Sequence, residues 1–74
     1  MKHTIRIREL REDRNLAQRE IADLLNVGQK TYSDYELGKT RIPLESIIIL
    51  AKYYDVSVDY ICGLTKERGK FPAK

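Results

Sequence analysis

The stretch between Gln29 and Leu37 carries side chains that can form hydrogen bonds to the edges of nucleic-acid bases. Tyr32 and Tyr35 are spaced i and i+3 and would share the inward face of a helix. At about 100° per residue, the opposite face then carries Gln29, Lys30, Ser33, Asp34 and Leu37. Glutamine can pair with adenine through two hydrogen bonds, and lysine can reach O6 and N7 of guanine. The simpler alternative is a solvated polar face on an ordinary helical hairpin.

Another helix and a tight turn precede this face and would position it. Residues 18–25 carry apolar side chains at the spacing i, i+3 and i+4, which predicts a short amphipathic helix: Ile21, Leu24 and Leu25. In the break that follows, Asn26 can end this helix and Gly28 can precede the next one. Two short helices joined by so tight a turn cross steeply and share a small core, with Val27 between them.

From about Ile7 to Leu64, the chain resembles the helix-turn-helix regulators of the phage repressor and Cro type, the XRE family. The resemblance rests on two segments, IRELREDRNLAQREIADLLNVGQKTYSDYELGK and IPLESIIILAKYYDVSVDYICG. Its specific points are Gln18, Ala22, Val27, Glu36, Gly38 and the V-S-V-D-Y run. It implies an all-α fold, a compact five-helix lambda-repressor-like DNA-binding domain with the helix-turn-helix at its second and third helices.

The resemblance implies a sequence-specific DNA-binding transcriptional regulator, most simply a repressor that binds a palindromic operator as a homodimer. The partner would be double-stranded DNA, with base edges contacted by Gln29, Lys30, Ser33 and Asp34. Phosphates would be contacted by Gln18 at the start of the second helix and by the loop residues Lys39 and Arg41. For the loop, ordinary solvation is the alternative.

The resemblance also implies two structural contacts. An ion pair between Arg11 and Glu36 would fix the angle of the recognition helix, and truncating either partner would cost about 3–5 kcal/mol if the other stayed buried. The last helix would contribute to the dimer contact through Val58, Ile61 and Leu64, although Val56 and Ile61 are both expected to be mostly core.

Some residues depart from the family's pattern. Ala17 and Gly28 stand at helix starts where the family has Ser or Thr, so that only backbone N–H groups remain there for a phosphate. Leu37 replaces the family's usual Asn. Asp34 has two interpretations: it can accept a hydrogen bond from cytosine N4, or Lys30 can neutralise it across one helical turn.

The first helix should be capped by Thr4, run to about Arg14 and stop at Asn15. Its arginines alternate with acidic residues, which favours a solvated, ion-paired role for Arg6 and Arg8 over a basic patch that binds DNA.

The fourth helix should start at Pro43 and run to about Tyr54. Its inward face is predicted to consist of Leu44, Ile47, Ile48, Ala51 and Tyr54, with Leu50 flanking it. Ile49 and Tyr53 would lie on the opposite side. Ser57 can cap a last helix from Val58 to about Gly63.

From Thr65 the composition becomes charged and is interrupted by Gly69 and Pro72. The predicted organisation is therefore a helix-turn-helix domain at residues 1–64 and a charged, flexible tail at residues 65–74.

Composition narrows the class of protein. The 74 residues include 14 Lys and Arg against 11 Asp and Glu, a net charge of +3 that favours nucleic acid over acidic partners. The single cysteine, Cys62, excludes an internal disulfide and indicates a reducing compartment. With no membrane span and no signal-peptide pattern, we expect a cytoplasmic protein.

No catalytic arrangement, metal-ligand cluster or phosphate-binding loop occurs in the sequence, so we expect no enzyme, no metal and no cofactor. The chain is also too short for a separate domain that binds a small-molecule ligand. The alternative function is a protein-interaction module, such as an antitoxin-like or anti-regulator protein. The exposed pair Ile49 and Tyr53 would serve that role.

Overall fold

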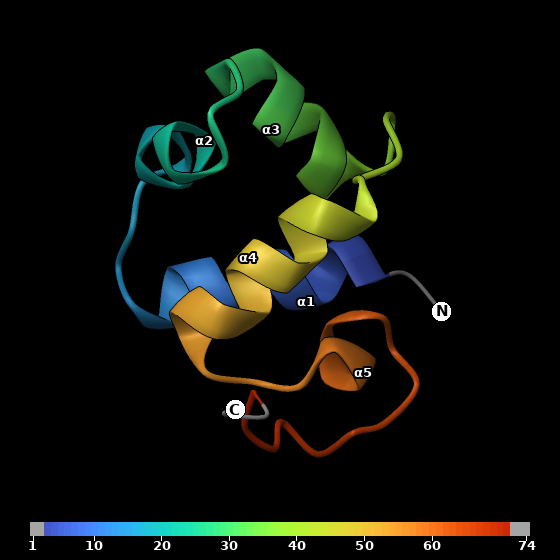
Figure 1. Cartoon of the computed structure of the whole chain (residues 1–74). Helices are drawn as coiled ribbons and strands as arrows, with labels where there is room; N and C mark the ends of the chain where they lie inside the picture. Colours follow the sequence, from blue (N-terminus) through green and yellow to red (C-terminus); the bar gives the residue numbers. More distant parts are fainter. Residues whose placement is uncertain (1–2, 72–74) are drawn as a thin grey trace.

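The computed structural model describes residues 3–71, and that part of the chain forms five helices and no strand (Figure 1). They are α1 (His3–Asp13), α2 (Gln18–Leu25), α3 (Gln29–Leu37), α4 (Leu44–Tyr54) and α5 (Val58–Ile61). The predicted all-α, five-helix fold is confirmed, with α2 and α3 as the helix-turn-helix. Within the described residues, no helix has the length and apolar character needed to cross a membrane.

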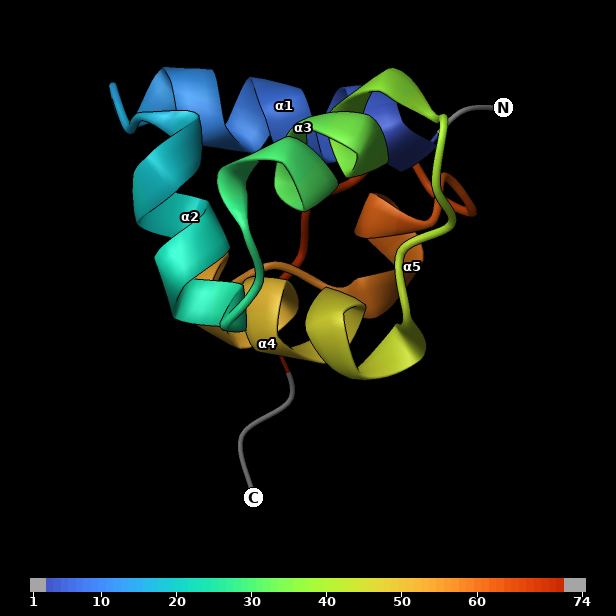
Figure 2. The same ribbon diagram turned by 90° about the horizontal axis from the view of Figure 1, so that it is seen from above.

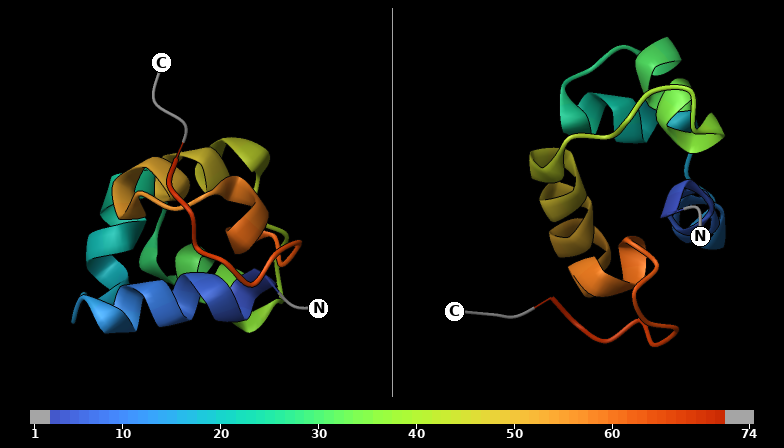
Figure 3. Two further views of the ribbon diagram at one scale, coloured as in Figure 1. Left: turned by 90° about the horizontal axis from the view of Figure 1, so that it is seen from below. Right: turned by 90° about the vertical axis from the view of Figure 1, so that its right-hand side faces the viewer.

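The helices enclose one core and leave one side of α3 uncovered. Seen from above, α1 and α4 lie on opposite sides, α2 and α5 close the two ends, and α3 lies between them nearest the viewer (Figure 2). From the side, α2 and α3 gather at one end and α5 lies at the other (Figure 3, right). Within residues 3–71, no helix covers the side of α3 that faces away from α4 and α5.

The core is apolar and draws on every helix. Its largest fully buried side chains are Tyr32, Ile7, Ile21, Leu50 and Ile61. For α4, the predicted inward face is wrong at two positions, because Leu50 is fully buried and Leu44 is 64 % exposed. Leu44 is the first residue of α4.

Left-handed residues end three of the helical segments where the sequence predicts them. Asn15 has φ 55°, Asn26 has φ 60° and Gly38 has φ 77°. This conformation costs little for Gly and Asn and frees the chain to turn away from the helix axis. The prediction that Thr4 caps α1 is wrong, because the backbone is already helical at His3.

The last helix is capped as predicted but is shorter than predicted. The Ser57 Oγ accepts a hydrogen bond from the backbone N–H of Tyr60 at 3.0 Å. The helix ends at Ile61, before the predicted end at Gly63. Gly63 is in the left-handed conformation (φ 82°), and the chain changes direction there.

Residues 65–71 return along the domain, where the composition predicts a flexible tail. The Ser57 N–H donates to the Arg68 carbonyl at 2.8 Å, and the Arg68 guanidinium pairs with Asp13 at 2.6 Å. Phe71 packs, partly buried, against the core. These partners lie far away in sequence, so the local composition carries no signal of the contacts. The remainder of the predicted tail, residues 72–74, lies outside the described residues.

Candidate nucleic-acid interface

Two buried tyrosines anchor α3 from below. Tyr32 and Tyr35 are both buried, and their rings meet edge to face with centroids 6.3 Å apart. On the opposite side Gln29, Lys30 and Leu37 are exposed, whereas Ser33 and Asp34 are half-buried. The four residues predicted to contact bases therefore share the outward side of α3, with the last two recessed.

Lys30 and Asp34 approach each other across one turn of α3. Lys30 Nζ lies 3.8 Å from Asp34 Oδ2, and the two side chains are 88 % and 22 % exposed. Such a pair is weak in water because solvent screens it and the lysine side chain is mobile. The lysine side chain can therefore leave Asp34 at little cost in free energy.

The turn between α2 and α3 follows the predicted pattern. Asn26 ends α2, and Val27 packs, partly buried, against the core. Gly28 caps α3 in an extended conformation (φ −70°), and a Cβ built on it would have no atom within 4 Å. The glycine is therefore not required by the backbone, and its effect is the missing hydroxyl.

The ion pair between α1 and α3 is present and nearly buried. Arg11 Nε donates to Glu36 Oε2 at 2.7 Å, and Arg11 Nη2 donates to Glu36 Oε1 at 3.1 Å. Arg11 Nη1 also donates to the Leu16 carbonyl at 2.8 Å, which ties the pair to the segment before α2. The geometry is the two-pronged arrangement in which arginine binds carboxylates most strongly.

A third group completes this cluster. The Gln18 side-chain amide, at the start of α2, donates through Nε2 to Glu36 Oε1 at 3.1 Å. Burial alone would raise the pKa of Glu36, but its contacts with Arg11, Tyr32 and Gln18 outweigh burial and hold that pKa below its usual value. Glu36 is therefore a charged acceptor at neutral pH, and Gln18, predicted to contact a phosphate, is bonded to it.

Two tyrosine hydroxyls lie buried near this cluster, on Tyr32 and Tyr54. Neither hydroxyl meets hydrogen-bond geometry with a protein group, although that of Tyr32 lies close enough to Glu36 for each to influence the other. Burial above all, and then Glu36, raises the pKa of Tyr32, and burial also raises the pKa of Tyr54. Both hydroxyls therefore stay protonated and contribute no charge beneath α3.

The loop after α3 offers two cations beside the recognition helix. Lys39, Thr40 and Arg41 are exposed, and Ile42 is buried directly after them. The backbone N–H groups of Lys39 and Thr40 both donate to the Asp34 carbonyl, at 2.9 and 3.3 Å. The backbone of this loop is thus fixed to α3 at one end and to the core at the other, while its side chains remain in solvent.

At the start of α2, half of a capping box is present. The Glu20 carboxylate accepts a hydrogen bond from the backbone N–H of Ala17 at 2.8 Å. Ala17 has no hydroxyl to return the bond, as its sequence implies.

Two arginines of α1 have structural roles that their local sequence does not indicate. Arg6 donates to the carbonyls of Tyr60 and Thr65, at 3.0 and 3.2 Å, and covers the Tyr60 ring. Arg14 donates to the Tyr54 carbonyl at 3.1 Å, at the end of α4. The prediction of a solvated role is therefore wrong for Arg6, because its partners come from the far end of the chain. Arg8 has the predicted solvated, ion-paired role, and its partner is Glu12.

The residues predicted for dimer contact lie in different environments. Ile61 is fully buried, which confirms its expected core role and rules it out as a dimer contact. Val58 is half-buried and Leu64 is 77 % exposed.

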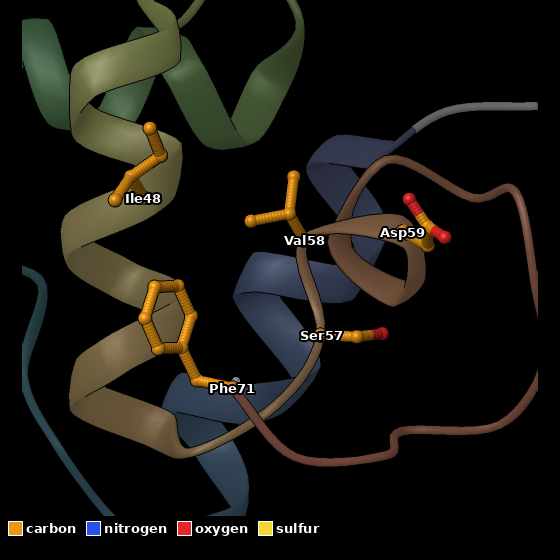
Figure 4. A pocket seen from close by; sticks show the side chains of 5 residues that line it. All are labelled: Ile48, Ser57, Val58, Asp59 and Phe71. Atoms are coloured by element: carbon orange, nitrogen blue, oxygen red, sulfur yellow. The ribbon is translucent and has the colours of Figure 1, made fainter. Parts of the chain in front are cut away.

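An open groove of about 350 Å³ lies between α4 and α5 (Figure 4), and its lining residues are Ile48, Ser57, Val58, Asp59 and Phe71. In residues 3–71, no three His, Cys, Asp or Glu side chains are grouped as metal ligands.

Comparison with known proteins agrees with this geometry. The family model described as "Helix-turn-helix" matches residues 7–61. The uncharacterized HTH-type transcriptional regulator YobD of Bacillus subtilis (strain 168) is 40 % identical over 62 residues, which cover 84 % of this chain and 55 % of that protein. The HTH-type transcriptional regulator AnsR of the same organism is 36 % identical over 67 residues, 90 % of this chain and 58 % of that protein.

A phage protein is also similar. The cryptic phage CTXphi transcriptional repressor RstR of Vibrio cholerae is 43 % identical over 53 residues, covering 72 % of this chain and 48 % of that protein. The chain thus spans about half the length of these curated relatives. With its α2–turn–α3 unit, its outward recognition face and the family match over most of its length, the chain belongs to the helix-turn-helix family of the phage repressor and Cro type, the XRE family.

Proposed function

We propose that this protein is a sequence-specific DNA-binding transcriptional regulator, a repressor that binds a palindromic operator as a homodimer. The observation that carries the proposal is the outward face of α3, which lies opposite the buried Tyr32 and Tyr35 and faces away from α4 and α5 (Figure 2). An α-helix of this kind fits the major groove of B-DNA, where every base pair presents a distinct pattern of donors and acceptors.

The base contacts follow from the order of exposure along α3. Gln29 and Lys30, both exposed in the first turn, would enter the groove deepest and contact adenine and guanine. Ser33 and Asp34, which are recessed, would contact bases at the groove edge. Release of Lys30 by Asp34 would leave the carboxylate free to accept a hydrogen bond from cytosine N4.

The phosphate contacts would come from both sides of α3. Lys39 and Arg41 would bind the backbone beyond the end of α3, and Gln18 would bind it at the start of α2. Two cationic contacts from each protomer neutralise four phosphates, so log K should fall against log salt with a slope of about −4. The neutral Gln18 amide adds affinity without adding to the slope.

Dimerisation would use the side of the domain at α4 and α5. Leu44 and Leu64 are the most exposed large apolar side chains there, and Val58 lies half-buried between the helices. The domain measures 30 × 25 × 23 Å. Two copies side by side would place their recognition helices about one DNA turn, ~34 Å, apart. Repression would follow because a bound dimer excludes polymerase from the operator.

Selection of binding sites from random DNA tests the proposal. The purified chain should enrich a palindrome, and Lys30→Ala should weaken binding to it about tenfold or more and relax the preference at one position of each half-site. Lys66→Ala is the matched control, because Lys66 is exposed and belongs to the segment after α5, and that segment lies at the opposite end of the molecule from α3 (Figure 1). Enrichment of no sequence, together with a salt-independent interaction with one protein, would instead favour a protein-interaction module.

A further inference from the structure

The Gln18 amide, at the start of α2, is bound within the protein by a charged partner. Its Nε2 donates to Glu36 Oε1 at 3.1 Å, and Arg11 occupies the same oxygen at 3.1 Å and the other oxygen at 2.7 Å. Gln18 itself is half-buried at the start of α2. The three side chains join α1, α2 and α3 at one point.

The chemistry of the carboxylate determines how the amide is oriented. An ionised carboxylate has acceptors only, so it can face the NH₂ end of a glutamine amide but not the carbonyl end. The bond to Glu36 uses one of the two amide hydrogens of Gln18. The other amide hydrogen of Gln18 is not used by the bond to Glu36, so it can donate to a second acceptor.

We propose that Glu36 is a positioning residue for DNA binding: it fixes the Gln18 amide so that its second N–H is presented to one backbone phosphate. The inference rests on the proposed function, since it requires DNA as the partner. Orienting the amide before binding removes most of the conformational entropy that a free glutamine side chain would lose in the complex. Since Glu36 belongs to α3, the phosphate contact is also linked to the angle of the recognition helix.

The test replaces single phosphates of a selected operator by neutral methylphosphonates. Wild type should lose about three- to tenfold in affinity at one phosphate per half-site through the loss of one hydrogen bond from Gln18. The affinity of Gln18→Ala for the operator should not change when that same phosphate is replaced. Glu36→Gln should be equally insensitive there, because a neutral amide at position 36 no longer dictates which end of the Gln18 amide faces inward.

Two controls separate positioning from a general structural defect. Lys39→Ala identifies the phosphate that Lys39 contacts, and Glu36→Gln should still lose affinity when that phosphate is replaced. Arg11→Lys should still lose affinity when the phosphate contacted by Gln18 is replaced, because Glu36 stays charged. Full sensitivity of Glu36→Gln at the Gln18 phosphate would overturn the proposal. If Gln18→Ala binds DNA and loses affinity at the same methylphosphonate positions as the wild type, the positioning role fails and the proposed function stands.

A measurement on the wild type covers the case in which Glu36→Gln does not fold. Nuclear magnetic resonance should show one side-chain amide proton of Gln18 protected from exchange in the free protein. Gln29, the other glutamine of the chain, is exposed and serves as the internal reference. Exchange of both Gln18 protons at the rate seen for Gln29 would overturn the proposal.

Discussion

Among single residues, Arg11 and Glu36 have the largest expected effect on stability. Their side chains are only 13 % and 3 % exposed. Arg11→Ala should therefore lower the free energy of unfolding by about 3–5 kcal/mol, because it leaves a carboxylate buried without its partner. Urea unfolding measures this loss. Arg8→Ala is the matched control, since its exposed pair with Glu12 should contribute less than about 1 kcal/mol.

The same carboxylate makes stability depend on pH. Because the pKa of Glu36 is lower in the folded than in the unfolded chain, its stabilising effect is complete above the unfolded value, about 4.3, and is lost as the pH falls through the folded value. The difference in unfolding free energy between wild type and Glu36→Gln should be constant above about pH 5 and shrink as the pH falls further. A difference that grows with acidity would contradict this assignment.

The sequence predicts this ion pair only through the family resemblance, and it does not predict the bond from Gln18 to Glu36 or the role of Arg6. Residues 6 and 60 are in contact although they are 54 positions apart in the sequence. On a helix, an arginine next to acidic residues has the same sequence pattern whether its side chain stays in solvent or donates to carbonyls at the end of a distant helix. Local pattern therefore cannot separate Arg6 from Arg8.

Among the helices, the starts of α2 and α3 show how far local signals determine structure. Both helices begin where the sequence predicts, although Ala17 and Gly28 lack a capping hydroxyl. Ala17→Ser should complete the capping box with Glu20 and raise the free energy of unfolding by about 1 kcal/mol. Gly28→Ser should add only a few tenths of a kcal/mol, because glycine is already an acceptable cap. Equal effects of the two substitutions in thermal unfolding would contradict this account.

Helix ends were predictable where one residue decides them, as at Asn15, Asn26 and Gly38. The burial of Leu50 in place of Leu44 was not predictable from the sequence. Both residues fit an apolar face of a helix, and which of them is buried depends on where the neighbouring helices lie. The path of residues 65–71 was not predictable either, since Arg68 and Phe71 find their partners on α1 and beside α4.

For the domain as a unit, the exposed apolar side chains define the expected assembly. Leu64→Asp should abolish dimer formation in sedimentation experiments and weaken operator binding, because it places a charge in the proposed contact while leaving the core intact. Ile49→Asp, on the outward side of α4, should leave both unchanged. Loss of dimerisation in the Ile49 variant alone would place the contact on the other side of α4.

The central claim is that DNA binds to the outward face of α3. Titration of ¹⁵N-labelled protein with the selected duplex measures this most directly through shifts of the amide resonances. The largest shifts should occur from Gln29 to Asp34 and in the loop at Lys39 to Arg41, with small shifts around Ile49 and Tyr53. Shifts concentrated at Ile49 and Tyr53, with α3 unchanged, would contradict the account.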